Sequence, residues 1–345
     1  MGSVKDLQVL AEPRKDRLGL GRFVFSDRYS VFDWGEMPDL IPFKGASLCL
    51  ISAYFFQKME GVCNTHYLGV VEGGRMKALD ELESPTNVME IRLVRVLRPR
   101  LRNGELDYTV FKKERSNFLI PLEIIYRNSL PPGSSVFKRI QRGEVSYRDL
   151  GLDSYPKPGC RLEKPILDVS TKLEDPDRYL TWDEAREIAS LSVEEVEEVR
   201  RLTLKVNSLI TAEVLKAGLF NEDGKIELAF DSNRRLMVVD AVGTPDECRF
   251  TLNGFHVSKE AAREFYRGTK WFKEVEMAKK AWGTGCQGDW RSHVRLKPPP
   301  LSPDVKRLIS NLYAACANEI TGRRWFDVPQ LRSVVEEYGS MVKDR

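Results

Sequence analysis

The sequence predicts an antiparallel sheet carrying one helix in its first 127 residues, followed by helices and a β-hairpin in the remainder. Two observations lead to this expectation. Short apolar stretches of strand-forming residues recur before residue 127, whereas helical spacing of apolar residues occurs there only at Ala46–Glu60. Helices that could connect parallel strands are therefore sparse, which favours antiparallel pairing. Beyond residue 180 the apolar positions take on helical spacing instead.

Five stretches are expected to form strands in the first part: Leu20–Phe25, Tyr67–Val71, Val88–Leu97, Tyr108–Phe111 and Phe118–Arg127. The region 130–180 differs because prolines and glycines are dense in it. Such a density predicts loops, and structured loops over a scaffold often carry binding residues.

Helix boundaries can be read from capping residues in the second half of the chain. Capping boxes that begin at Thr181 and Ser192 predict two helix starts. Gly218 is placed to end the second helix as a left-handed cap. The tail is expected to be helical from Ser258 and again over Ser302–Thr321, where a proline stands in the first turn.

Length and composition predict a soluble protein large enough for two domains. The chain has 345 residues, of which 42% are hydrophobic and 30% charged, with 54 basic and 51 acidic side chains giving a net charge of +3. This balance argues against a nucleic-acid coat or a polybasic membrane binder. The longest apolar run, Ala46–Phe56, is too short for a bilayer span, and no secretory signal is recognisable. The six cysteines have no metal-ligand or redox spacing, so reduced thiols in the cytoplasm are expected.

The hairpin formed by Lys225–Asp231 and Leu236–Val242 is the most informative local pattern. If the turn is Ser232–Arg235, Glu227 lies directly opposite Asp240. Two carboxylates paired across strands repel each other unless a cation lies between them, and Mg²⁺ prefers such oxygens. The alternative is that Glu227 faces solvent and Asp240 caps the following turn.

Other patterns are weaker. Residues 283–288 match G-x-G-x-x-G, but a helical stretch precedes them, so a coincidental glycine-rich loop is favoured over a dinucleotide site. Residues 90–115 carry an excess of basic side chains, which could form a nucleic-acid face or attract a polyphosphate. A solvated sheet edge is the favoured interpretation. No Walker A sequence, nucleophile elbow or H-E-x-x-H is present, so chemistry is expected to rest on carboxylates, lysines and arginines, as in phosphoryl transfer.

Four blocks of sequence stand in order: Ser26–Asp33 followed by Lys44 and Gly45, Pro121–Asn128 followed by Gly133 and Ser134, Ser170–Glu174, and Lys225–Phe230 followed by Val239–Phe250. These blocks resemble the signatures of the SAICAR synthetase (phosphoribosylaminoimidazole-succinocarboxamide synthase) family of purine biosynthesis. The resemblance implies an α+β fold with an N-terminal antiparallel sheet lobe over a larger mixed α/β C-terminal lobe and ATP in the cleft. It implies an ATP-binding lobe over 1–120, a catalytic lobe over 121–255 and a helical part over 256–345.

The reaction implied by the resemblance is an ATP-dependent ligation. L-Aspartate is joined to the carboxylate of carboxyaminoimidazole ribonucleotide (CAIR) through an acyl phosphate, giving SAICAR, ADP and phosphate. The implied partners are these small molecules, with no nucleic acid and no membrane, and self-association into a homo-oligomer is left open. Two alternatives remain: an enzyme of the same fold that phosphorylates or ligates another acid, and a nucleotide-binding regulator that contacts nucleic acid through residues 90–115.

The resemblance also implies roles for particular residues. Lys225, Glu227 and Asp240 would be catalytic, with Glu227 and Asp240 as ligands of Mg²⁺. The ATP-binding set comprises Lys15, Leu122, Glu123 and Lys225, in which Leu122 and Glu123 would contact adenine through backbone groups. The substrate-binding set comprises Asp27, Arg28, Ser30, Asp33, Lys44, Arg127, Ser134, Ser170, Lys172, Asp177, Asp246 and Arg249, in which Arg127, Ser134 and Arg249 resemble the cradle of a 5′-phosphate. Lys15 is the weakest assignment, because Glu12–Asp16 replaces the R-G-K hairpin that many family members carry.

Overall fold

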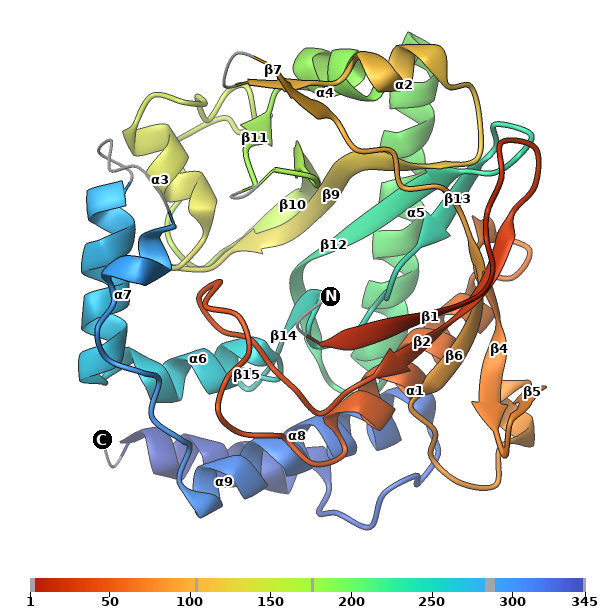
Figure 1. The fold of residues 1–345 in the computed structure, drawn as a ribbon. Coiled ribbons are helices and arrows are strands. Elements are labelled where there is room, and N and C mark those ends of the chain that lie inside the picture. The colour runs from red at the N-terminus through yellow and green to blue at the C-terminus, as the bar shows by residue number, and fades with distance from the viewer. Residues whose placement is uncertain (1–3, 103–104, 175–176, 283–288, 344–345) are drawn as a thin grey trace.

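Two sheets organise the chain in the computed structural model, which describes residues 4–102, 105–174, 177–282 and 289–343. The smaller sheet is antiparallel, with the order β1-β2-β6-β4-β5. Its strands are β1 (Lys5–Ala11), β2 (Gly19–Phe25), β4 (Tyr67–Glu72), β5 (Arg75–Lys77) and β6 (Val88–Leu93). It forms the right-hand side of the molecule in Figure 1.

The larger sheet fills the centre of the molecule, with the order β11-β10-β9-β12-β13-β3 and with β14 and β15 attached beside β12. It is mixed, because β13 pairs with β3 in parallel and its other pairs are antiparallel. Its strands are β3 (Asn64–Thr65), β9 (Phe118–Leu130), β10 (Cys160–Thr171), β11 (Tyr179–Leu180), β12 (Phe220–Phe230), β13 (Leu236–Val239), β14 (Cys248–Leu252) and β15 (Phe255–His256). A separate ribbon pairs β7 (Arg100–Arg102) with β8 (Glu105–Asp107).

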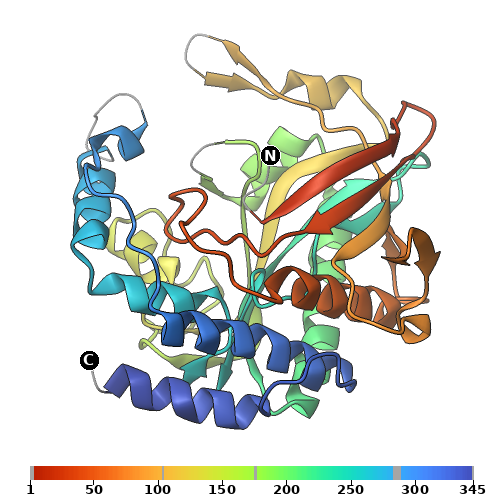
Figure 2. The same ribbon diagram turned by 60° about the horizontal axis from the view of Figure 1, so that its bottom comes forward.

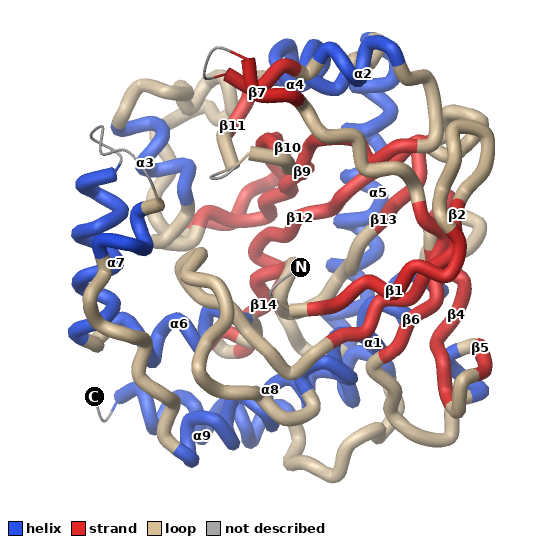
Figure 3. Tube along the Cα trace, viewed as in Figure 1, coloured by secondary structure: helices blue, strands red, loops and turns tan. Residues whose placement is uncertain are grey.

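Helices surround the two sheets, as Figures 2 and 3 show. The α-helices of the described residues are α1 (Lys44–Lys58), α2 (Thr109–Lys113), α3 (Ser135–Gln141), α4 (Trp182–Ala189), α5 (Val193–Lys216), α6 (Lys259–Arg267), α7 (Lys270–Trp282), α8 (Pro303–Thr321) and α9 (Leu331–Lys343), and short 3₁₀ turns cover η1 (Leu79–Glu81) and η2 (Trp290–His293). An antiparallel sheet beside a larger mixed sheet with helices around both is an α+β fold, which confirms the predicted class. None of the described helices is both long and apolar enough to span a bilayer.

Helix α1 ties the two sheets and the C-terminal helices together. It packs against strands of the smaller sheet on one side and against α8 on the other, so most of its residues are buried. The Ser52 hydroxyl accepts the N–H of Val242 at 3.1 Å, which attaches the segment after β13 to α1. Gly243 in that segment has φ +68°, and an added Cβ would lie 2.2 Å from the Phe55 ring. Only glycine lets this segment pass so close to α1.

The capping predictions are confirmed. Thr181 and Ser192 form capping boxes at the starts of α4 and α5. Gly218, with φ +72°, follows the end of α5, and Gly322, with φ +69°, ends α8. The five cysteines that the structure describes are all free thiols, as expected, while Cys286 and the rest of the glycine-rich stretch 283–288 lie outside the described residues.

Three local predictions are wrong. The expected strand Tyr108–Phe111 belongs to helix α2, because the Asp107 carboxylate accepts the N–H of Thr109 at 2.9 Å and starts a helical turn. The region 130–180 is not all loop: it contains α3 and the long strand β10. Pro165 fits inside β10 because it lies at a break in the register with β9, between Arg161 and Ile166, where no ladder hydrogen bond is lost.

The basic stretch 90–115 forms a solvated sheet edge only at β7 of the two-stranded ribbon, so that prediction is wrong for the rest of the stretch. Strand β6 lies inside the smaller sheet, between β2 and β4, and the following residues leave that sheet for the β7–β8 ribbon. The Arg95 guanidinium pairs with Glu114 at 2.9 Å, and Arg102 pairs with Asp107 at 3.1 Å. Part of the local positive charge is therefore neutralised within the chain.

Burial of α1 predicts a large difference between two helical leucines. Leu50 in α1 is fully buried, whereas Leu215 in α5 is 66% exposed. We expect Leu50→Ala to lower the free energy of unfolding by about 2–5 kcal/mol, because it leaves a cavity in the core. Leu215→Ala is the matched control, with a change within about 0.5 kcal/mol. Urea unfolding followed by circular dichroism measures both, and equal losses would contradict this account of the core.

Candidate active site

The two carboxylates predicted to face each other across the hairpin are offset by one residue. Glu227 pairs with Val239, and Asp240 follows the last residue of β13. The predicted opposition is wrong because Asp231 belongs to the turn: its N–H donates to the Arg235 carbonyl at 3.0 Å. The Asp231 carboxylate also accepts the N–H of Asn233 at 2.8 Å and the N–H of Arg235 at 2.9 Å, so the turn is one residue longer than predicted.

Asp240 nevertheless interacts strongly with Glu227. The backbone of Asp240 has φ +66°, a left-handed conformation that is uncommon outside glycine and that turns the chain away from the strand direction. Burial raises the pKa of Glu227 to about 8, and the neighbouring Asp240 carboxylate contributes to the rise. The hairpin therefore brings the buried Glu227 carboxylate near the half-buried Asp240 carboxylate, although not in the predicted register.

Three lysines from separate elements surround this pair. Lys5, at the start of β1, lies 2.8 Å from the Asp240 carboxylate. Lys172, just after β10, bonds the Glu227 carboxylate and lies 3.2 Å from Glu123 on β9. Lys225 on β12 lies 2.7 Å from Glu123 and 3.6 Å from Glu247. We refer to these residues as the carboxylate–lysine cluster: Lys5, Glu123, Lys172, Lys225, Glu227 and Asp240.

Opposing charges fix most protonation states in this cluster. Burial would lower the pKa values of Lys5, Lys172 and Lys225, but the surrounding carboxylates outweigh it and raise all three. Burial would raise the pKa of Asp240, but Lys5 and Lys172 hold it below its usual range. Asp240 is therefore the more readily ionised carboxylate of the pair, and Glu227 the less readily ionised one.

The donor set fits a divalent cation of the Mg²⁺ type. Glu227 and Asp240 offer hard oxygen ligands, and lysine ammonium groups now lie against both carboxylates where a cation would bind. In the described ranges, no group of three or more histidine, cysteine or carboxylate side chains is arranged to hold a metal. Two carboxylates alone suit an ion that completes its shell with phosphate oxygens and water.

A second group of charges lies further along the same strands. Arg127 on β9 lies 3.2 Å from Asp168 on β10 and 3.4 Å from Asp223 on β12. Arg249 on β14 donates from Nε to Asp223 at 2.7 Å, and Arg139 of α3 pairs with Asp168. We refer to Arg127, Arg139, Asp168, Asp223 and Arg249 as the arginine cluster.

The arginine cluster has capacity left for an anion. Its three guanidinium groups face two carboxylates, so it carries an excess positive charge. Arg127 is only 2% exposed, and the Nε atoms of Arg127 and Arg139 have no hydrogen-bond partner within the described structure. Arg139 and Asp168 of this cluster also line a cavity of about 1430 Å³, together with Asp177 and Tyr179. A guanidinium group at the wall of a cavity suits a phosphate or carboxylate.

Several predicted site residues are engaged in contacts with neighbouring elements. Lys44 is fully buried and donates to Asp246 at 2.7 Å, while the Tyr313 hydroxyl donates to the same carboxylate at 2.6 Å. Asp27 accepts the N–H of Gly45 at 2.9 Å and so anchors the Ser26–Asp33 segment to α1.

Three further residues of the Ser26–Asp33 block contact residues outside both charged clusters. Arg28 donates to Asp6 at 2.7 Å. Asp33 is exposed and lies 2.6 Å from Lys279 of α7. Ser30 lines a small enclosed cavity beside Asp246. These contacts do not test the substrate-binding roles predicted for the three residues, so those roles stay predictions.

The other predicted residues lie along β9 and β10. Ser170 is buried opposite Glu123. The Leu122 side chain belongs to the core, while Ser134 caps α3 by accepting the N–H of Val136 at 3.4 Å. Loss of solvation raises the pKa of Asp177 to about 6, and the nearby Glu123 carboxylate adds to the rise.

Lys15 is outside the carboxylate–lysine cluster. It lies between β1 and β2, is 71% exposed and pairs with Glu114 at 3.2 Å. Lys5 takes the place beside Asp240, and sequence reasoning missed it because a lone lysine near the N-terminus carries no spacing signal. Asp223 was also missed, yet it alternates with Lys225 and Glu227 on one face of β12, and that two-residue period could have revealed it.

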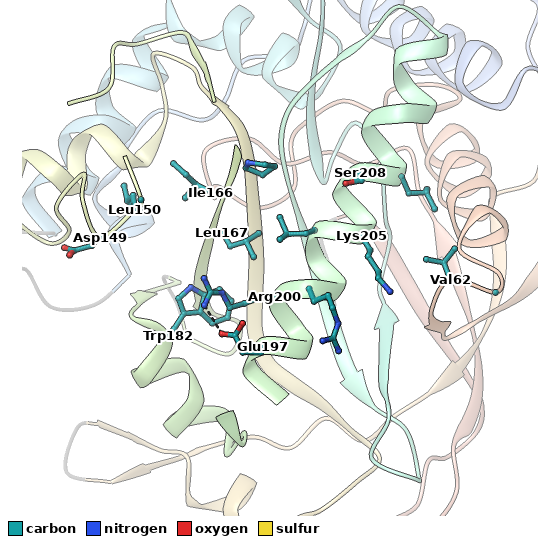
Figure 4. Close-up of a pocket in the computed structure, with 16 residues that line it drawn as sticks. Val62, Asp149, Leu150, Ile166, Leu167, Trp182, Glu197, Arg200, Lys205 and Ser208 are labelled. Carbon is teal, nitrogen blue, oxygen red and sulfur yellow. Dashed lines mark hydrogen bonds and ion pairs between the residues drawn. The ribbon is translucent and has the colours of Figure 1, made fainter. Parts of the chain in front are cut away.

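A further cavity lies away from the two charged clusters. It measures about 1010 Å³ and lies between α5 and residues 165–167 of β10. Figure 4 shows Trp182, Arg200 and Lys205 on its wall, with Arg200 bonded to Glu197 at 2.9 Å. It contains no residue of either charged cluster.

Comparisons with known proteins agree with one another. The profile of the SAICAR synthetase family matches residues 2–281. A protein of Archaeoglobus fulgidus, provisionally named a phosphoribosylaminoimidazole-succinocarboxamide synthase, is 57% identical over 345 residues, covering 99% of this chain and all of the relative. The Thermoplasma volcanium enzyme of that name is 34% identical over 313 residues, covering 88% of this chain and 93% of the relative.

Solved structures give the same fold. The Saccharomyces cerevisiae SAICAR synthase complexed with SAICAR has a TM-score of 0.61 at 20% identity and covers 94% of each chain. A type-2 SAICAR synthetase in complex with ADP has a TM-score of 0.56 at 20% identity, covering 84% of this chain and 98% of the other. The family profile and these sequence relatives identify an ATP-dependent carbon–nitrogen ligase. The chain belongs to the SAICAR synthetase family of purine biosynthesis.

The two buried carboxylates Glu227 and Asp246 are expected to respond differently to neutralisation. At pH 7 without divalent ions, Glu227→Gln should change the free energy of unfolding by less than about 1 kcal/mol, because burial and the Asp240 carboxylate already disfavour the charged form of Glu227. Asp246→Asn should lower it by about 3 kcal/mol or more, because Lys44 loses its buried counter-charge. Urea unfolding with a chelator present measures both, and the exposed loop variant Asp153→Asn is the control. A larger loss for Glu227→Gln than for Asp246→Asn would contradict this account of the two carboxylates.

Proposed function

We propose that this enzyme joins L-aspartate to the carboxylate of CAIR at the expense of ATP, releasing SAICAR, ADP and phosphate. The observation that carries the proposal is the placement of both charged clusters on the same two strands. Glu123 and Arg127 are four residues apart on β9, and Glu227 and Asp223 are four residues apart on β12. The separation is about 13 Å at the usual rise of a strand. A ribonucleotide bound along these strands would have its 5′-phosphate at one cluster and its carboxylate at the other.

The carboxylate–lysine cluster would serve the transfer of the γ-phosphate. Glu227 and Asp240 would hold Mg²⁺, which would neutralise charge on the phosphate oxygens of ATP. Lys5, Lys172 and Lys225 already lie within bonding distance of these carboxylates or of Glu123, so they would contact the phosphates in the same space. Their raised pKa values keep them charged at neutral pH.

Two displacements then complete the reaction. An oxygen of the CAIR carboxylate attacks the γ-phosphorus, and the bond to ADP breaks. The neutral amine of L-aspartate attacks the resulting carbonyl carbon, phosphate leaves with the electron pair of the carbon–oxygen bond, and the amine nitrogen loses a proton. The protein's contribution is alignment and the exclusion of water from the acyl phosphate.

The arginine cluster would hold the 5′-phosphate of CAIR. Arg127 and Arg249 are both bonded to Asp223, which fixes their orientation before a ligand arrives. Ser134 lies next to Ser135, whose hydroxyl oxygen accepts a hydrogen bond from Arg127 at 3.2 Å. Residues Asp27, Arg28, Ser30, Asp33, Lys44, Ser170, Lys172, Asp177 and Asp246 complete the proposed substrate-binding set.

Irregular pairing of β9 supports an adenine contact near Leu122 and Glu123. Against β12, Glu123 pairs with Glu227 while Leu119 pairs with Ala229, so three β9 residues stand opposite one residue of β12. Pro121 in this stretch has no N–H to donate. The bulge interrupts the ladder next to the carboxylate–lysine cluster, where backbone groups can bond an adenine edge. The division into lobes over 1–120, 121–255 and 256–345 forms part of this proposal.

Omission of each substrate tests the proposed function. With ATP, Mg²⁺, CAIR and L-aspartate present, we expect steady ADP formation and a product with the mass of SAICAR. Leaving out CAIR or L-aspartate should reduce ADP formation to background. ADP formation at the full rate without L-aspartate would indicate a kinase, and no ADP formation with all substrates would contradict the proposal.

A comparison of two lysine-to-alanine variants tests the nucleotide end of the site. Lys5→Ala should raise the KM for ATP by about ten- to hundredfold, because a charged hydrogen bond near the phosphates is lost. Lys15→Ala, on the same hairpin, should change it by less than about twofold, because this exposed side chain contacts only Glu114. Initial rates at saturating CAIR and L-aspartate measure both values. The opposite order would restore Lys15 as the ATP-binding residue.

A further inference from the structure

His66 is the single residue between β3 of the larger sheet and β4 of the smaller sheet. Its backbone bonds a strand on each side of this junction. The His66 N–H donates to the Val238 carbonyl of β13 at 3.1 Å, and the His66 carbonyl accepts the N–H of Arg92 on β6 at 2.7 Å. Strand β13 belongs to the larger sheet and β6 to the smaller one. His66 therefore joins the two sheets through hydrogen bonds as well as through the chain itself.

The His66 side chain is held firmly at this junction. It is 3% exposed, and its ring packs against Phe23 of β2 and Phe56 of α1, with ring centroids 5.7 and 5.3 Å away. Its Nε2 atom lies 3.0 Å from the backbone carbonyl oxygen of Asp240. Because a carbonyl oxygen can only accept a hydrogen bond, Nε2 carries the hydrogen and is the donor. The imidazole thus holds the main chain at a member of the carboxylate–lysine cluster.

The main chain at Asp240 depends on such support. Its φ of +66° lies in the left-handed region, which is unfavourable for a residue with a Cβ and persists where the surrounding structure holds it. The carboxylate of Asp240 is held by Lys5 of β1 at 2.8 Å. The chain beyond it is held by the bond from Val242 to Ser52 of α1. His66 bonds the carbonyl between these two attachments.

The bond to the carbonyl controls where the Asp240 carboxylate lies. Rotation about φ moves the carbonyl group and Cβ together, because both are attached to Cα. A carbonyl oxygen that is held in place therefore fixes the direction in which the side chain leaves the backbone. Loss of the bond would free the Asp240 carboxylate to move away from Glu227, although both residues would still be present.

We propose that His66 is a positioning residue of the metal site, which holds Asp240 in the backbone conformation that places its carboxylate near Glu227. This inference rests on the proposed function, in which these two carboxylates bind Mg²⁺. Groups that bond to metal-binding residues commonly set the affinity for the metal. Because His66 also joins the two sheets, the geometry of the metal site depends on how the sheets meet.

Nucleotide binding with and without metal tests this role. The probe is the β,γ-imido analogue of ATP, whose Kd titration calorimetry gives in Mg²⁺ and in a chelator. His66→Phe keeps a ring between Phe23 and Phe56 but removes the donor. We expect its Kd in Mg²⁺ to rise about tenfold, and its Kd in chelator to change by less than about twofold, because the metal site alone is disturbed. His66→Gln, whose amide can donate to the same carbonyl, should recover most of the affinity.

Thr203→Val is the matched control, because it also removes a buried side-chain bond to a backbone carbonyl, from Thr203 to Val199 at 2.8 Å. Thr203 lies in α5, which supplies no residue to either charged cluster. Both of its Kd values should stay within about twofold of the wild-type values. Thermal unfolding checks that the variants are folded, and His66→Leu replaces His66→Phe if the latter is not.

Three results would overturn the role of His66: an equal rise of the Kd in Mg²⁺ and in chelator, an equal loss in Thr203→Val, or no recovery in His66→Gln. The wild-type enzyme separates this inference from the proposed function. Its Kd for the analogue should be lower in Mg²⁺ than in chelator, and a Kd indifferent to Mg²⁺ would overturn the metal assignment within the proposed function instead.

Discussion

Repulsion between the buried Glu227 carboxylate and the half-buried Asp240 carboxylate is the constraint around which the site is arranged. Two like charges in a low-dielectric setting cannot both be ionised without cations nearby. The fold supplies those cations from distant parts of the chain: Lys5 begins β1, and Lys172 follows β10. The two sheets therefore meet at a point of charge balance.

A rigid support keeps this arrangement in place. The segment after Asp240 is fastened to α1 through the bond from Val242 to Ser52 and through the close approach of Gly243 to Phe55. Three residues after Gly243, the buried pair of Lys44 and Asp246 joins α1 to the same segment. The C-terminal helices contribute through Tyr313, whose hydroxyl bonds Asp246. Helix α8 therefore supports the site through its bond to Asp246, which is not one of the paired carboxylates.

Local signals predicted the parts of the structure that depend on neighbours in sequence. The caps at Thr181 and Ser192 and the hairpin around Glu227 follow from residues a few positions apart. The predicted hairpin register is wrong by one residue because the Asp231 side chain closes the turn. The alternation of apolar and polar residues cannot show such a bond. Lys5 was missed because its partner lies 235 positions away, and its identity depends on how the two sheets meet. The family resemblance supplied roles that no spacing rule contains.

The strands β9 and β12 give the site its dimensions. Side chains at every second position share a face, so Asp223, Lys225 and Glu227 form a row, and Glu123 and Arg127 stand beside it. Charge changes along this row, from arginines bonded to Asp223 at one end to lysines around Glu227 at the other. A ligand with a phosphate at one end and a carboxylate at the other would meet side chains of opposite charge at both ends of this row.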